Sequence, residues 1–157
     1  MTEVQRQIEL MQLTFEGDET GEARFGPALM HLLKDVDSAR ALHRPLPDAH
    51  TIWELVLHVV AWKRYTAIRL RDQRAEMNES LDWPKPTETS EADWQRTVRD
   101  LRDIQAELIS ASAALKDDQL ETPVAGGRVP RYLVLQGIMQ HDIYHAGQIA
   151  LLKKAAK

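Results

Sequence analysis

Apolar residues recur at three- and four-residue steps in four long stretches of the chain, which is the pattern of amphipathic α-helices. These stretches cover residues 2–17, 51–70, 90–115 and 130–154. A shorter apolar run at 27–36 follows the first stretch after a polar break. No segment shows a convincing alternation of period two, the pattern of a half-buried strand. We therefore predict an all-α protein with four main helices, the first of which is interrupted.

Three of the long stretches begin with residues that typically start a helix. Thr51 is followed three residues later by Glu54, and Ser90 by Asp93, which are the spacings of a capping box. Pro130 suits the first turn of the last helix, because the N–H that proline lacks would have no partner there. These signals place the starts of three helices independently of the apolar pattern.

The connections between the helices are irregular and unequal in length. Residues 79–90 contain two prolines and no periodicity, so we predict a long crossover within an antiparallel four-helix bundle. Residues 121–130 are rich in glycine and proline and could form a short hairpin. The pair Gly126-Gly127 lacks the strand, lysine and serine of a phosphate-binding loop, and we assign it no phosphate site.

Composition narrows the class of protein. The chain has 157 residues, with 20 basic and 24 acidic side chains and a net charge of −4, a balance that gives no indication of nucleic-acid binding. We expect one domain over residues 1–157. The basic run that starts at Lys63 and reaches Arg74 is expected to be a helix end that leaves the core and is solvated.

The chain contains no cysteine, which excludes disulfides, thiolate ligands and a thiol nucleophile of its own. The sequence begins without a basic segment followed by an apolar run. No window approaches 18 uncharged apolar residues, the length of a membrane span. We expect a soluble, cytoplasmic protein with no membrane contact.

Three histidines lie on helix faces that are predicted to point inward. His141 and His145 are four residues apart, so their rings lie above one another on one face of the last helix. His58 shares an apolar stripe of the 51–70 helix with Leu55 and Trp62. Packed helices lie about 8–10 Å apart, so the three imidazoles can converge on one ion. The alternative is three core histidines, each with a separate hydrogen-bond partner.

A metal ion explains the three histidines economically, because each unpaired polar group buried in a core costs about 1–3 kcal/mol. Three protein ligands leave one coordination position open, as in catalytic rather than structural sites. Imidazole suits Zn²⁺, Ni²⁺ and other first-row ions, so ligand type alone does not identify the metal. Gln148 could orient a ligand or only bond within the core, and Asp142 could support a ligand or only face solvent.

Two segments of the chain resemble the paired motifs of the DinB/YfiT-like superfamily. They are residues 51–62 (TIWELVLHVVAW) and residues 140–149 (QHDIYHAGQI). Residues 15–18 and 26–27 also resemble a subset of that family. The resemblance implies a four-helix bundle in which His58, His141 and His145 hold a divalent metal, with Zn or Ni the expected ion. It also implies a homodimer, for which the four tryptophans would supply apolar surface.

Some members of the superfamily transfer low-molecular-weight thiols, such as bacillithiol or mycothiol, onto electrophiles. The resemblance therefore implies a metal-dependent transferase that activates a small thiol. Trp62 and Tyr144 are candidates for the wall of the pocket that holds this thiol, and ordinary core packing is an equal alternative for both. Two alternatives stay open. One is a metal-dependent hydrolase that uses metal-bound hydroxide, and the other is a stress-associated metal-binding protein without catalysis. In each enzymatic case the partner is a small-molecule substrate.

Overall fold

A computed structural model describes residues 1–156, and these residues are predominantly helical. The prediction of an all-α protein is confirmed, because no strand is present in this range. The helices are α1 (Glu3–Glu16), α2 (Leu29–Leu33), α3 (Ser38–Leu42), α4 (Ile52–Leu70), α5 (Glu79–Asp82), α6 (Glu91–Ala113), the 3₁₀ helix η1 (Asp117–Gln119) and α7 (Arg131–Ala155).

The predicted helix starts are confirmed by the hydrogen bonds that cap them. The Thr51 hydroxyl accepts from the Glu54 amide at 3.2 Å, and the Glu54 carboxylate accepts from the Thr51 amide at 2.8 Å. The same reciprocal pair joins Ser90 and Asp93 at the start of α6. Pro130 is the N-cap residue of α7, one position before the first turn that the sequence suggested, and it makes no side-chain capping bond. A local capping box thus fixes where α4, the helix that carries His58, begins.

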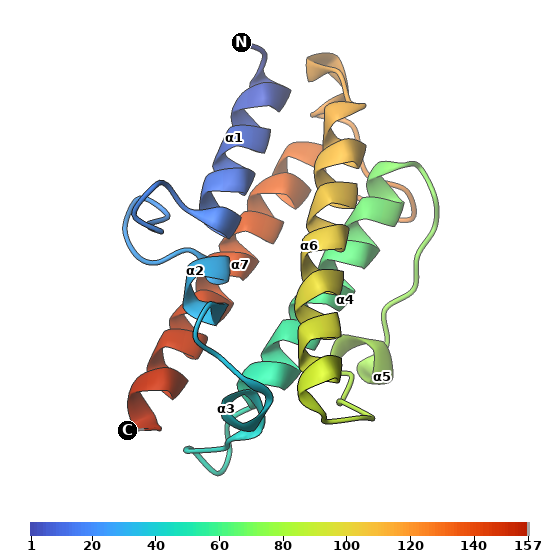
Figure 1. Ribbon diagram of the computed structural model, residues 1–157. Helices are drawn as coiled ribbons and strands as arrows, with labels where there is room; N and C mark the ends of the chain where they lie inside the picture. The colour runs from blue at the N-terminus through green and yellow to red at the C-terminus, as the bar shows by residue number, and fades with distance from the viewer. Residues whose placement is uncertain (157) are drawn as a thin grey trace.

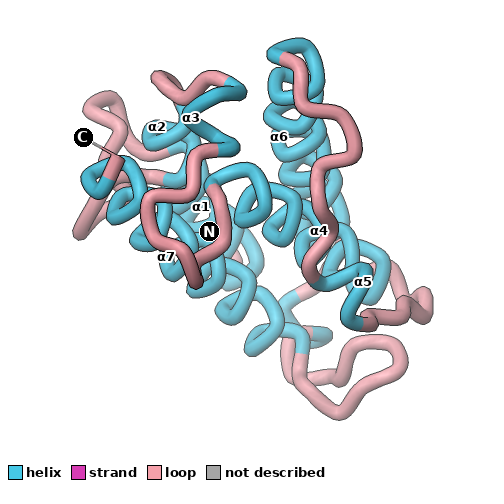
Figure 2. The backbone as a smooth tube through the Cα atoms, turned by 90° about the horizontal axis from the view of Figure 1, so that it is seen from below, coloured by secondary structure: helices cyan, strands magenta, loops and turns pink. Residues whose placement is uncertain are grey.

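Four long helices, α1, α4, α6 and α7, form the bundle (Figure 1). Seen from below, α4 and α6 lie together on one side, while α1 and α7 lie together on the other (Figure 2). The helices α4 and α6 point the same way, opposite to α1 and α7 (Figure 1). The expected antiparallel arrangement therefore holds for α4 with α7 but is wrong for α4 with α6. The long crossover carries the chain from the C-terminal end of α4 back to the end of the bundle where α4 begins. Because α6 starts there, α4 and α6 run parallel (Figure 1).

The connections contain short helices that the apolar pattern did not predict. Both α3 and α5 are one turn long, too short to show a 3.6-residue period or to be stable without packing. The crossover is therefore not wholly irregular: α5 sits within it and contacts α4. In place of a hairpin at 121–130, a single isolated bridge joins Pro123 and Pro130.

The core is built from the apolar stripes of the long helices. Trp53 and Trp94 are fully buried in it, and their rings meet edge to face at 5.3 Å. Each indole N–H finds an acceptor, the Thr97 hydroxyl at 3.0 Å and the Val36 carbonyl at 2.6 Å, so both rings are buried without an unpaired donor. Two of the four tryptophans are thus core residues, and only Trp62 and Trp83 remain available to line a site.

Within residues 1–156, none of the helices combines the length and the apolar character needed to span a lipid bilayer. The cytoplasmic location and the single domain over residues 1–157 stay predictions from the sequence.

Candidate metal centre

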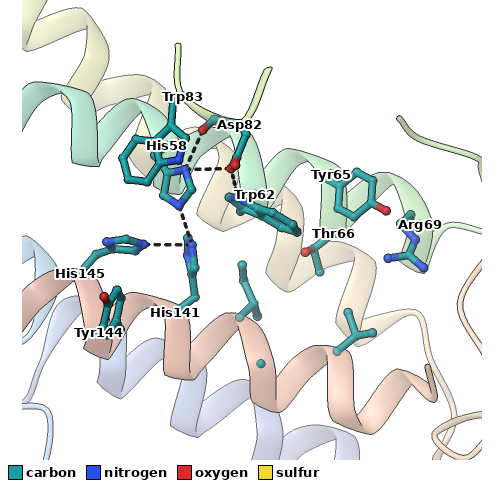
Figure 3. Close-up of a pocket in the computed structure, with 13 residues that line it drawn as sticks. His58, Trp62, Tyr65, Thr66, Arg69, Asp82, Trp83, His141, Tyr144 and His145 are labelled. Atoms are coloured by element: carbon teal, nitrogen blue, oxygen red, sulfur yellow. Dashed lines mark hydrogen bonds and ion pairs between the residues drawn. The ribbon is translucent and has the colours of Figure 1, made fainter. Parts of the chain in front are cut away.

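The structure brings His58 of α4 together with His141 and His145 of α7 (Figure 3). The Nε2 atom of His141 lies 3.0 Å from Nε2 of His58 and 3.1 Å from Nε2 of His145. Two nitrogens bound to one tetrahedral zinc ion at about 2.0–2.1 Å would lie about 3.3 Å apart. The three side chains are therefore already spaced for a common ligand sphere, with all candidate ligand atoms within 4.8 Å of one another.

Neighbouring oxygens fix the orientation of two of the three rings. The backbone carbonyl of Asp82 lies 2.6 Å from Nδ1 of His58, and the side-chain oxygen of Gln148 lies 2.6 Å from Nδ1 of His145. Both oxygens are acceptors, so each Nδ1 carries the proton and each Nε2 presents a lone pair. A hydrogen bond to the second imidazole nitrogen is the usual support of a metal-bound histidine.

The third ring makes the cluster unfavourable without a positive charge at its centre. A proton on Nε2 of His141 can point at only one of its two neighbours, and Nδ1 of His141 is buried without a partner among residues 1–156. In at least one of the two Nε2–Nε2 contacts, two lone pairs then face each other at about 3 Å and repel. A cation bound by all three nitrogens removes this repulsion. The donor set therefore fits a divalent metal ion.

Burial keeps the three imidazoles neutral, as metal binding requires. Burial lowers the pKa of His141 to about 3, and the nearby His145 and His58 rings add to the effect. Burial also lowers the pKa of His58, against the opposing effect of Asp82, and lowers the pKa of His145, against the opposing effect of Gln148. The three rings are therefore mainly uncharged at neutral pH.

The short helix α5 and the residue that follows it supply two side chains that the sequence analysis did not identify as part of the site. Asp82 holds the His58 ring through its carbonyl, and its carboxylate accepts from the Trp62 indole at 2.7 Å. Trp83 stacks on the His58 ring at 3.8 Å, with only 8° between the two planes. The one sequence signal for this helix is Asn78, whose side chain caps it by accepting from the Leu81 amide. That signal predicts a helix start but not its contact with His58.

Asp142 and Gln148, each left with two interpretations by the sequence, have different roles. Gln148 holds the His145 ring, as described above. Asp142 does not face solvent: it is fully buried and accepts from the Lys63 ammonium at 2.6 Å. Lys63 also donates to Gln105 at 2.8 Å and is fully buried, so the expectation that α4 leaves the core at this residue is wrong. The Lys63–Asp142 pair joins the two helices that carry the histidines.

A pocket of about 540 Å³ opens beside the three histidines, a volume typical of small-molecule sites. It runs between α4 and α7, away from the cluster (Figure 3). Trp62 and Tyr144 line it, as predicted, together with Tyr65, Thr66, Arg69, Asp82, Trp83, Val134, Gly137 and Ile138. Aromatic and aliphatic groups dominate this wall, so the pocket favours a partly apolar molecule next to the candidate metal position.

Comparison with known protein families matches residues 24–149 to the DinB superfamily. The match covers most of the chain and includes all three histidines, so the chain belongs to the DinB superfamily. A search of curated proteins found no match. Family membership and the histidine cluster together define this protein as a DinB-superfamily helical bundle with a site compatible with a divalent metal ion.

Proposed function

We propose that His58, His141 and His145 bind one divalent transition-metal ion through their Nε2 atoms. One observation carries the proposal: the Nε2 atoms of His58 and His145 both point at Nε2 of His141. Hydrogen bonds at Nδ1 hold the His58 and His145 rings in this orientation. Three nitrogen ligands with one open position suit Zn²⁺, and imidazole also suits Ni²⁺. We propose zinc or nickel as the resident ion.

We further propose that the protein is an enzyme that transfers a low-molecular-weight thiol to an electrophile. A metal ion with an open position stabilises the deprotonated form of a thiol bound there. The chain has no cysteine, so the thiol must come from a cosubstrate. In the reaction the sulfur forms a bond to an electrophilic carbon, the leaving group departs with its electron pair, and the thiol proton passes to solvent.

The residues around the pocket would bind and orient the reactants. Trp62, Trp83 and Tyr144 provide flat apolar surfaces beside the cluster and limit the access of water to it. Asp82 and Gln148 hold the rings of His58 and His145 at fixed angles, so the position of the reacting sulfur is set before the electrophile enters.

The test is a screen of electrophiles against bacillithiol, mycothiol, glutathione, cysteine and coenzyme A. Metal-loaded protein, chelated protein and His141→Ala are assayed side by side against the uncatalysed thiol background. The proposal expects conjugation that is lost in the second and third samples. Equal rates in all three samples would reject thiol activation at the cluster. Turnover that needs the metal but no thiol would favour a hydrolase, and silence in every screen with metal still bound would favour a binding protein.

We also propose that two copies of the chain form a dimer through the outer face of α7. Phe25 is 98% exposed, and it borders a groove lined by Ile143, Gly147 and Ala150. A fully exposed phenylalanine beside an exposed isoleucine is unusual for the free surface of a small protein. The small residues of α7 would let a helix of the second copy approach closely.

A further inference from the structure

We propose that Arg69 binds a carboxylate or phosphate group of the substrate at the end of the pocket that lies away from the three histidines. The substrate or cosubstrate is then an anion whose charge is separated from its reacting atom by an apolar segment. The inference rests on the proposed function only in placing the reacting atom at the histidine cluster. The anion site itself depends on residues of α4 and of the loop at residues 120–130, here called the 120s loop.

The register of α4 places Arg69 on the wall of the pocket. His58, Trp62 and Tyr65 lie on one face of the helix, and Arg69 follows one turn further along. At 1.5 Å per residue, the eleven positions from His58 to Arg69 correspond to about 16 Å along the helix axis. Figure 3 shows the guanidinium beyond Tyr65, at the opposite end of the pocket from the imidazoles. The pocket therefore has a cation at one end and the candidate metal position at the other.

The Arg69 guanidinium is held in place by contacts that leave its outer nitrogens available. Its Nε donates to the Ala125 carbonyl at 3.1 Å, and its central carbon lies 4.9 Å from the centre of the Tyr65 ring. A methyl group at Gly127 would lie 2.2 Å from Nη2, so glycine at this position permits the observed approach. Neither Nη atom has a hydrogen-bond partner within the part of the chain that the structure describes. These two donors form the planar fork that binds a carboxylate or phosphate through two parallel hydrogen bonds.

Among the described residues, Arg69 has no carboxylate partner, unlike Arg71 and Arg131. Arg71 pairs with Glu107 at 3.5 Å, and Arg131 pairs with Asp72 at 2.5 Å. Arg69 makes no ion pair with any residue from 1 to 156. Asp82 is the one carboxylate on the pocket wall, and it is engaged at the other end with His58 and Trp62. An anionic group on a bound molecule would supply the missing partner.

The competing interpretation is that Arg69 only covers the Tyr65 ring and points its charge into water. Arg69 is half-buried, which is compatible with that arrangement. The two interpretations differ in ligand preference. A solvated arginine gives little preference for an anion over an uncharged molecule of the same shape, whereas an anion site gives a clear one.

The experiment measures binding by calorimetry and by tryptophan fluorescence, with two matched pairs of probes. Chelated protein is titrated with phenylbutyrate and with phenylbutyramide, which have the same shape but differ in charge. Zinc-loaded protein is titrated with mercaptooctanoate and with its amide, which can also reach the histidine cluster. The variants are Arg69→Met and Gly127→Ala, and Arg64→Met is the control because this exposed arginine of α4 lies outside the pocket. Unfolding midpoints confirm that every variant is folded.

We expect the wild type and Arg64→Met to bind each carboxylate about tenfold more tightly than its amide. Arg69→Met should bind acid and amide equally, and Gly127→Ala should lose part of the preference while keeping the charge. Equal binding of acid and amide by the wild type, or an unchanged preference in Arg69→Met, would overturn the proposal. Because the first probe pair needs no metal, failure of metal binding at the histidines affects only the second pair. Inorganic phosphate that displaces phenylbutyrate from the wild type but not from Arg69→Met would extend the site to phosphate groups.

Discussion

Replacing Lys63 by methionine tests the buried link between α4 and α7. Lys63 and Asp142 are both fully buried, and their 2.6 Å contact is the only ion pair between these two helices within residues 1–156. Burial is the largest influence on both groups: it lowers the pKa of Lys63 and raises the pKa of Asp142, while each charge opposes the shift of the other. Lys63→Met leaves the Asp142 carboxylate without its partner.

The expected loss is about 3–5 kcal/mol of unfolding free energy, the usual effect of removing one member of a buried pair. At about 2 kcal/mol per molar of urea, this moves the unfolding midpoint down by about 2 M. The triple variant Lys63→Met, Asp142→Leu, Gln105→Met removes the whole polar group. Asp142 and Gln105 each have one buried polar atom without a partner among the described residues, so their removal relieves a penalty. We expect the triple variant to recover most of the stability lost in Lys63→Met.

The assay is urea unfolding followed by circular dichroism on chelated protein, so that metal binding does not contribute to the free energy. The wild type, Lys63→Met and the triple variant are compared, with Arg64→Met as a control for the loss of an exposed positive charge on the same helix. A loss below about 1 kcal/mol in Lys63→Met would refute the reasoning. So would a triple variant that is less stable than Lys63→Met.

Four further predictions concern the cluster and the proposed dimer. Because burial lowers the folded-state pKa of His141 to about 3, zinc should remain bound below pH 6.5, where free imidazoles are protonated; calorimetry between pH 7 and pH 5 checks this. Because His141 stays neutral in the folded state, the metal-free protein should lose about 1.4 kcal/mol of unfolding free energy per pH unit as pH falls from about 6.5 toward 3, since the unfolded state takes up the proton first; urea unfolding against pH measures the slope. Gln148→Ala should weaken zinc binding about 10- to 100-fold in a chelator competition, since His145 loses its support, and an unchanged affinity would argue against that role. Phe25→Glu should give a sedimentation mass of one chain where the wild type gives two, and a monomeric wild type would remove the proposed dimer.

The sequence predicted those features whose cause is local. The apolar period and the capping residues Thr51 and Ser90 predicted the bounds of the long helices to within a few residues, because both signals depend on residues a few positions apart. The four-residue spacing placed His141 and His145 on one face of α7 for the same reason. Their meeting with His58 depends on the packing of α4 against α7, and the resemblance to the DinB/YfiT-like motifs supported that step. The match of residues 24–149 to the DinB superfamily supports this part of the interpretation.

The features that the sequence did not predict depend on contacts between distant segments. Lys63 looks like a surface residue because its partner Asp142 is 79 positions away, and only packing of α4 against α7 joins them. Asp82 and Trp83 lie in a stretch without periodicity, and their positions against His58 follow from the path of the crossover. Arg69 belongs to a basic run that suggested a solvated helix end. The 120s loop and Tyr65 hold it at the pocket instead.

The metal content of purified histidine variants tests the central claim most directly. Elemental analysis would be made on the wild type, on His58→Ala, His141→Ala and His145→Ala, and on His43→Ala, which replaces an exposed histidine outside the cluster. We predict about one zinc or nickel ion per chain in the wild type and in His43→Ala, and much less in the three cluster variants. Wild-type metal content in both His58→Ala and His145→Ala would contradict the proposed site.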